Sequence, residues 1–224
     1  MNDKIERVKK IVKKKMICPG HNIDHVMRVY SLAITLAENE KIDKEILQLA
    51  TLLHDIGSDL ELADESGKTD HAVESARIAK NILQKIGVSN KKIKHIQNCI
   101  LSHRYKNKHK PETLEAKLLF DADKLDAIGA IGIARSYVWI GKNNAFIYKK
   151  VGDLEKYAKQ NLSGKVGGRI QDKSKHSPQI EFETKLKFLP ENMHTKKGKE
   201  IAIERLKFYK DFLDRLENEI IGKK

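Results

Sequence analysis

Apolar side chains recur three or four positions apart over most of the chain, which is the spacing of amphipathic helices. The predicted helices lie around 8–12, 26–37, 43–57, 72–87, 93–100, 112–140 and 201–216. The first must stop before Pro19-Gly20, because proline breaks a helix. Gly57 and Gly87 are placed as the glycines that end the third and fourth helices.

The sixth of these helices is predicted to be long and central. Pro111 opens its first turn, a position that tolerates a missing N–H group. Several small residues along it would permit close helix packing: Ala127, Gly129, Ala130 and Gly132. Residues 141–177 are richer in glycine, lysine and asparagine, which predicts loops and short helices. Without an internal repeat or a strand-rich block, the sequence predicts an all-α fold.

The length and composition of the chain predict one folded domain spanning residues 1–224. Apolar residues make up 40% of the chain and fall in helical registers, which excludes wholesale disorder. No apolar run is long enough to span a membrane, and the N-terminus is charged where a signal peptide needs apolar residues. Cys18 and Cys99 are too few for a disulfide framework. We therefore expect a soluble, cytoplasmic protein without membrane contact.

The chain is strongly basic. Its 44 Lys and Arg face 31 Asp and Glu, so the formal charge is +13. Such a charge attracts anions, and phosphates are the obvious candidates. The lysines near the N-terminus have an alternative explanation, which is that they form the solvent-exposed face of a helix. Nucleic-acid binding is an alternative that we do not favour, because only 6% of residues are aromatic and no RNA-binding module is present.

The most suggestive chemical element is the pair His54-Asp55, at the end of an apolar helix. Unpaired carbonyls and the negative end of the helix dipole favour a cation there. A histidine and an aspartate within an apolar run also need a partner to offset their desolvation, and a shared metal would supply it. His25 and Asp123 lie on two other predicted helices, and helical bundles build metal sites from ligands on different helices.

An ordered set of motifs accompanies these residues from about Pro19 to Tyr137. The motifs are H-N-I-D-H-V-M-R-V at 21–29, L-L-H-D-I-G at 52–57, H-A-V-E-S-A at 71–76, S-H-R at 102–104 and D-A-D-K-L-D-A-I-G at 121–129. Together they resemble the HD superfamily of metal-dependent phosphohydrolases. This resemblance implies an HD-domain helical bundle with a core of about 19–140 and a C-terminal helical extension of about 141–224.

The resemblance also implies a ligand set for a divalent ion: His25, His54, Asp55 and Asp123. His21 competes with His25, but His25 fits the motif better. A mixed imidazole and carboxylate set suits Mn²⁺, Fe²⁺, Co²⁺, Ni²⁺, Zn²⁺ or Mg²⁺. We favour a Mn²⁺-type metal because the subgroup that the chain resembles uses one.

Further candidate roles follow from the same motifs. His71 and His103 are expected to line a one-ion site and contact substrate, although some family members use such histidines for a second ion. Asp59 is the candidate for proton transfer beside Asp55, with a solvated loop carboxylate as the alternative. Three basic residues are candidate phosphate contacts, or else ordinary surface ion pairs: Arg28, Arg104 and Lys124. The remaining histidines carry no spacing argument and are expected at the surface: His95, His109, His176 and His194.

The function implied is hydrolysis of a small phosphorylated molecule, most plausibly a nucleotide. The segment D-A-D-K-L-D-A-I-G-A-I-G-I-A-R resembles the subgroup that splits (deoxy)nucleoside triphosphates into monophosphate and pyrophosphate by metal-activated water. The alternative within the class is a phosphomonoesterase or phosphodiesterase acting on nucleoside monophosphates, cyclic nucleotides or alarmones. A structural protein that assembles through its last helix would require these motifs to be coincidence, although that helix could still form a homo-oligomer.

Overall fold

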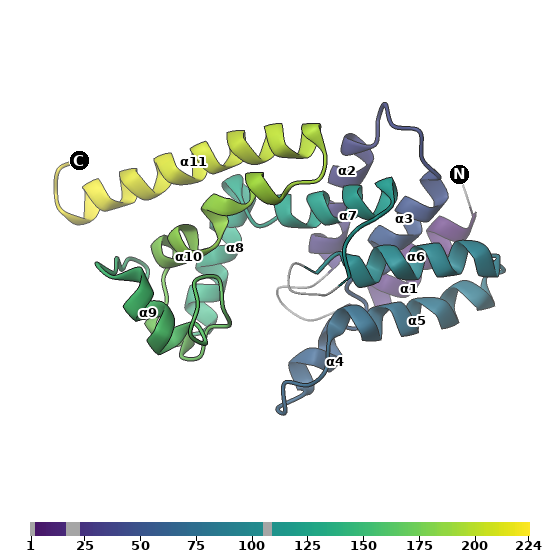
Figure 1. Cartoon of the computed structure of the whole chain (residues 1–224), viewed down its shortest axis with the longest axis horizontal. Coiled ribbons are helices and arrows are strands. Elements are labelled where there is room, and N and C mark those ends of the chain that lie inside the picture. Colours follow the sequence, from purple (N-terminus) through teal and green to yellow (C-terminus); the bar gives the residue numbers. More distant parts are fainter. Residues whose placement is uncertain (1–2, 17–22, 105–108) are drawn as a thin grey trace. The chain divides into compact units, whose positions relative to one another are not determined.

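The computed structural model describes residues 3–16, 23–104 and 109–224, and every regular element in these ranges is helical (Figure 1). This confirms the predicted all-α fold. The α-helices are α1 (Asp3–Lys15), α2 (Ile23–Leu36), α3 (Lys44–Leu53), α4 (Ser58–Ala63), α5 (His71–Lys85), α6 (Asn90–Ser102), α7 (Leu114–Leu125), α8 (Gly129–Lys142), α9 (Leu154–Asn161), α10 (Pro178–Thr184) and α11 (Lys196–Ile220). Short 3-10 helices lie at Lys173–Lys175, Leu186–Phe188 and Pro190–Asn192. The predictions that concern Cys18, Pro19-Gly20 and His21 lie outside the described residues.

The chain divides into two compact units, residues 1–123 and 124–224. We call them unit 1 and unit 2 and describe each by itself. The organisation as a single HD-type domain stays a prediction. In the described ranges, no helix combines the length and the apolar character needed to cross a membrane.

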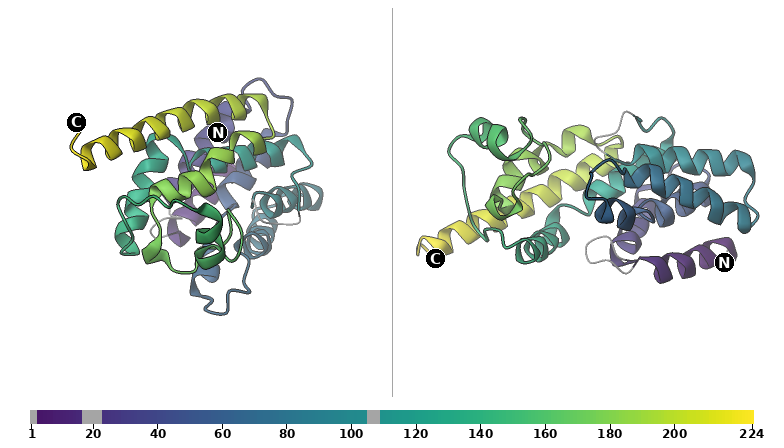
Figure 2. Two further views of the ribbon diagram at one scale, coloured as in Figure 1. Left: turned by 60° about the vertical axis from the view of Figure 1, so that its left-hand side comes forward. Right: turned by 90° about the horizontal axis from the view of Figure 1, so that it is seen from below.

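Unit 1 is built around α3. Its N-terminus is fixed by Asp43, whose carboxylate accepts hydrogen bonds from the backbone N–H groups of Glu45 and Ile46. Apolar residues around its circumference are buried, as expected of a helix enclosed by neighbours: Leu47, Leu49, Ala50, Leu52 and Leu53. Helices α1, α2, α5 and α6 all contact α3, while α5 and α6 lie side by side (Figures 1 and 2). The central helix of unit 1 therefore delivers its C-terminal residues into the middle of the bundle.

The predicted sixth helix is wrong in its length, because the structure divides 112–140 into α7 and α8. The helix breaks after Leu125, and Gly129 adopts a φ of 73°, a left-handed conformation that glycine accepts without strain. Arg135 donates to the carbonyl and the carboxylate of Asp126, and these contacts hold the break. Pro111 precedes α7 by three residues and does not lie in its first turn.

Gly132 makes this turn possible. A Cβ atom at Gly132 would lie 2.3 Å from the Ala127 carbonyl oxygen, a backbone atom that cannot rotate away. We expect Gly132→Ala to lower the free energy of unfolding by about 1–3 kcal/mol, the usual cost of overpacking. Gly141→Ala is the matched control on the same helix, because nothing lies within 4 Å of a Cβ added there. Denaturant unfolding of both variants checks this, and equal stabilities would contradict it.

The C-terminal side of α3 also differs from the prediction. The helix ends at Leu53, and Gly57 instead precedes α4, a one-and-a-half-turn helix that the hydrophobic pattern did not predict. A Cβ atom at Gly57 would lie 2.7 Å from the backbone nitrogen of Ser75 on α5. Glycine at this position lets α4 begin directly against α5.

In unit 2, α8 packs against α10 and α11. Tyr209 of α11 is fully buried, and its hydroxyl makes a 2.8 Å hydrogen bond with that of Ser136. Thr195 caps the N-terminus of helix α11, and its hydroxyl accepts from the Gly198 N–H. Figure 2 shows α11 as a long straight helix that leads to the C-terminus. The proposed homo-oligomer stays a prediction.

His176, expected at the surface, is only 2% exposed. Its Nε2 donates to Glu181 at 3.0 Å, and its Nδ1 accepts from the hydroxyl of Tyr157 at 2.9 Å. The amide of Asn161 in turn donates to the Tyr157 oxygen at 2.8 Å. The sequence prediction was wrong here because the partners that satisfy the buried imidazole come from other segments.

Stability of unit 2 should depend on pH through Glu181. Burial alone would raise the pKa of this carboxyl, but the charge of Lys185 and the hydrogen bond from His176 outweigh burial and hold the pKa well below its usual 4.5. A lowered pKa stabilises the fold above pH 4.5, and this contribution is lost as the pH falls further. We expect Glu181→Gln to lower the unfolding temperature at pH 7 and to lower it less at pH 3.5. An equal deficit at both pH values would contradict this.

Candidate metal centre

Two helix ends and the first turn of α2 bring the four predicted metal ligands together. The Nε2 atoms of His25 and His54 are 3.3 Å apart. The Asp55 Oδ2 atom lies 3.6 Å from the first and 3.7 Å from the second. Asp123 Oδ1 lies 3.4 Å from the first and 3.9 Å from the second. His25 belongs to the first turn of α2, His54 and Asp55 follow α3, and Asp123 lies near the end of α7.

The end of α3 orients His54. Its Nδ1 lies 2.7 Å from the carbonyl oxygen of Thr51, three residues earlier. A carbonyl can only accept, so the proton sits on Nδ1 and the lone pair of Nε2 faces the cluster. Burial lowers the pKa of His54 to about 4, and the nearby His103 and His25 act in the same direction. Near neutral pH this imidazole is therefore uncharged, and its Nε2 lone pair can bind a cation.

A second group of possible ligands shares Asp55 with the first. The other carboxylate oxygen, Oδ1, lies 3.5 Å from Nε2 of His71 and 3.5 Å from Nε2 of His103. These two nitrogen atoms are 3.2 Å apart. His103 ends α6 as His54 ends α3, and its Nδ1 lies 2.6 Å from the Ile100 carbonyl oxygen. Both groups have the ligand types and the proximity that could hold a metal ion.

The donor set fits a divalent cation. The ring nitrogens of His54 and His103 that face Asp55 carry lone pairs, because each ring holds its proton on the opposite nitrogen. Lone pairs and carboxylate oxygens that converge in a buried space repel one another unless a positive charge lies between them. Imidazole nitrogen with carboxylate oxygen is a ligand set for divalent transition metals. The arrangement accordingly calls for a bound cation.

The cluster is mostly buried. His54 is fully buried, and the side chains of His25 and Asp55 are 3% and 5% exposed. The side chains of Asp123 and His71 are 15% and 18% exposed. A small molecule would therefore reach the cluster past these two residues.

Glu61 is a site residue that the sequence analysis missed. Its Oε2 accepts a short hydrogen bond from Nδ1 of His71. Its Oε1 lies 2.7 Å from NH2 of Arg104, whose NH1 lies 3.0 Å from Asp70. Burial alone would raise the pKa of Glu61, but His71 and Arg104 outweigh burial and lower it. An ionised Glu61 thus fixes the proton of His71 on Nδ1 and leaves Nε2 to face Asp55.

The candidate for proton transfer, Asp59, is exposed on the first turn of α4 and takes part in none of the contacts described for this cluster. Glu61, two positions further along the same helix, reaches His71 instead. Recognition of helix α4 would have pointed to Glu61. This helix is too short for its apolar residues to show a helical period in the sequence. The role of Asp59 stays a prediction.

The three basic candidates have different surroundings. Arg104 is held by two carboxylates, Glu61 and Asp70, which favours a structural ion pair over a phosphate contact. Arg28 lies three residues after His25 on α2 and is partly exposed. Lys124 directly follows Asp123 on α7 and is partly exposed. His21, the competitor of His25, lies outside the described residues.

Comparisons with known proteins show which family the chain is similar to. Residues 22–128 match the family model of the HD domain. YpgQ of Bacillus subtilis is 30% identical over 207 residues, which cover 91% of this chain and 86% of YpgQ. The crystal structure of YpgQ in complex with ADP has a TM-score of 0.71 at 25% identity and covers 96% of this chain and 94% of that one. An HD-superfamily hydrolase from Bacillus thuringiensis has a TM-score of 0.68 at 27% identity, with 97% and 96% coverage. The chain therefore belongs to the HD superfamily of metal-dependent hydrolases.

Proposed function

We propose that the chain hydrolyses a (deoxy)nucleoside triphosphate to the monophosphate and pyrophosphate. The observation that carries this proposal is the convergence of imidazole nitrogens and carboxylate oxygens in a mostly buried cluster. The complex of the relative YpgQ with ADP supports a nucleotide ligand. The choice of a triphosphate, and of the bond cleaved, rests on the resemblance of residues 121–135 to triphosphate pyrophosphohydrolases.

In this proposal His25, His54, Asp55 and Asp123 hold one divalent ion, of the Mn²⁺ type. When bound, such an ion supplies a Lewis acid that activates water and polarises a phosphoryl group. The backbone carbonyl of Thr51 keeps the His54 ring in the tautomer that can bind the ion. Asp55 and Asp123 balance the positive charge in a site that excludes most water.

His71 and His103 line the same space and are proposed to contact the substrate. Glu61 holds the His71 ring in place, since its carboxylate accepts the Nδ1 proton. Arg28 and Lys124 are the partly exposed cations nearest in sequence to the ligands and are proposed to bind the remaining phosphates. Asp59 stays the candidate that the sequence offers for proton transfer to the leaving oxygen.

The test is a hydrolysis assay of the full chain with Mn²⁺, Co²⁺, Ni²⁺ or Mg²⁺, in which phosphate and pyrophosphate are quantified separately. We expect pyrophosphate from triphosphates. Free phosphate from monophosphates, or opening of cyclic nucleotides, would replace this substrate by the alternative within the class. Absence of turnover with every metal, together with binding of nucleic acid that weakens steeply with salt, would contradict the proposal.

Metal content tests the one-ion proposal. We expect about one ion per chain after dialysis, because Asp123 adds a fourth ligand side chain to the first group, whereas the second group has three and shares Asp55 with the first. His103→Ala should keep that ion. Two tightly retained ions, one of them lost in this variant, would show instead that His71 and His103 bind a second metal.

A further inference from the structure

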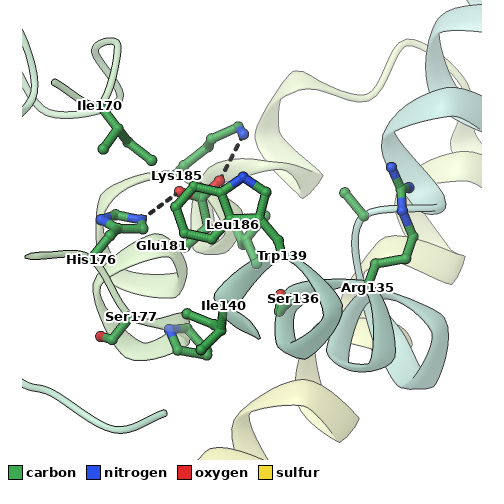
Figure 3. Close-up of a pocket in the computed structure, with 12 residues that line it drawn as sticks. Arg135, Ser136, Trp139, Ile140, Ile170, His176, Ser177, Glu181, Lys185 and Leu186 are labelled. Atoms are coloured by element: carbon green, nitrogen blue, oxygen red, sulfur yellow. Dashed lines mark hydrogen bonds and ion pairs between the residues drawn. The ribbon is translucent and has the colours of Figure 1, made fainter. Parts of the chain in front are cut away.

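Unit 2 contains a cavity of about 300 Å³ between α8 and α10 (Figure 3). Trp139 and Ile140 of α8, Ile170 and Leu186 form much of its apolar wall. Glu181 lines the cavity, and Figure 3 shows it between His176 and Lys185. The cavity thus combines an aromatic and aliphatic wall with a small number of convergent polar groups, which is typical of small-molecule sites.

The charges that line the cavity are largely paired. Lys185 Nζ lies 2.7 Å from one oxygen of Glu181, and the NH1 atom of Arg135 lies 2.6 Å from a carboxylate oxygen of Asp126. Each cation therefore has its own carboxylate partner. A cavity with little net charge is a poor site for a phosphate group but suits a neutral polar ring.

Glu181 is a fixed hydrogen-bond acceptor at the edge of this cavity. Its side chain is 24% exposed, and each oxygen takes part in one described contact, with His176 or with Lys185. A carboxylate offers about four lone-pair positions, so it can accept further N–H groups from a ligand. The buried chain from Asn161 through Tyr157 to His176 holds it from behind. An ionised carboxylate that is already in position gains a hydrogen bond without reorganisation.

We propose that this cavity binds the nucleobase of a nucleoside or nucleotide and selects bases that carry an exocyclic amino group. The amino N–H groups of adenine, guanine or cytosine donate to Glu181, and the ring packs against Trp139. Aromatic side chains stack on every base, whereas an ionised carboxylate distinguishes amino groups from carbonyl groups. The choice of a nucleoside or nucleotide as the ligand rests on the nucleotide part of the proposed function.

The only tryptophan of the chain, Trp139, lies in the cavity, so its fluorescence reports binding directly. The experiment titrates the full, metal-free chain with adenosine, uridine and N6,N6-dimethyladenosine. We expect saturable quenching by adenosine. The dimethyl analogue, which lacks both amino N–H groups, and uridine should bind at least about tenfold more weakly, because each loses a hydrogen bond to a charged group.

Glu181→Gln tests the acceptor from the protein side, since the amide replaces one oxygen with a donor group. We expect adenosine to bind this variant at least about tenfold more weakly. Glu183→Gln is the matched control on the same helix, because Glu183 pairs with Lys187 and does not line the cavity. Circular dichroism checks that both variants are folded. If Glu181→Gln does not fold, the comparison of adenosine with its dimethyl analogue on the unchanged protein decides.

Nucleosides carry no phosphate, so this test is independent of triphosphate hydrolysis. Absence of saturable quenching would overturn the proposal, as would equal affinities for adenosine and its dimethyl analogue. Asp55→Asn separates the two functions, because it should stop turnover while adenosine still quenches Trp139. If the triphosphate assay fails but adenosine binds as described, the nucleobase site stands and only the proposed reaction is lost.

Discussion

Asp55→Asn should remove both the bound metal and the turnover of the enzyme. Each oxygen of Asp55 faces a different pair of imidazoles, at 3.5–3.7 Å. The amide keeps the shape of the side chain but removes the negative charge that balances a cation in a buried space. We expect the loss of turnover to exceed the roughly 10- to 100-fold that follows loss of a group that only orients a metal ligand. Metal analysis and steady-state kinetics of the purified variant measure the two effects.

The control for this variant is Asp211→Asn, the same chemical change at an exposed position on α11, where Asp211 pairs with Lys207. It should retain the metal and full turnover. Asp55→Asn should also keep its helical circular dichroism, because removal of one carboxylate leaves the packing of α3 intact. A folded Asp55→Asn protein that still hydrolyses substrate would contradict the proposed metal centre.

Glu61→Gln should lower kcat by about 10- to 100-fold while the metal content and KM change little. The described contacts of Glu61 are with His71 and Arg104, so we expect it to act through the orientation of His71. The glutamine amide can present an N–H group to Nδ1 in place of an oxygen, and then Nε2 no longer presents its lone pair to Asp55 in the neutral ring. Rate and metal measurements on the same preparation separate this positioning role from loss of the ion.

Asp59→Asn gives the comparison that decides between two carboxylates on the same short helix. We expect its effect on kcat to be smaller than that of Glu61→Gln, because Asp59 is exposed and lies outside the described contacts of the cluster. Glu61→Asp should recover part of the rate, since the carboxylate is kept and only its reach is shortened. A larger loss in Asp59→Asn would support the assignment of proton transfer to Asp59.

Hydrophobic spacing predicted the longer helices of unit 1 because their apolar residues recur at helical spacing and pack on a shared core. Hydrophobic spacing did not predict the break between α7 and α8 at 126–128, because small and apolar residues continue across it. What ends α7 is a set of polar contacts, from Arg135 to Asp126 and from Arg205 to the Leu125 carbonyl. Those partners lie far along the chain or on the next helix, so no local pattern contains them.

The sequence predicted those residues of the site that belong to the ordered motifs. His25, His54, Asp55 and Asp123 were placed by ordered motifs, and the structure brings them together. Glu61 could not be identified from the sequence, because its contact with His71 depends on the direction in which α4 runs. The six residues of α4 are too few to reveal a helical period. The cavity in unit 2 was also beyond sequence reasoning, since Trp139 and Glu181 meet only through the packing of α8 and α10.

The main-chain anchors of His54 and His103 have an evolutionary consequence. Both rings are steered by a carbonyl oxygen three residues earlier, at Thr51 and Ile100. Every amino acid supplies that oxygen, so drift of the side chains at these two positions leaves the steering unchanged as long as the helices end where they do. Natural selection that preserves the metal centre therefore acts on the lengths of α3 and α6 more than on which residues occupy positions 51 and 100. We expect a one-residue insertion or deletion in either helix to be less tolerated than most substitutions at these two positions.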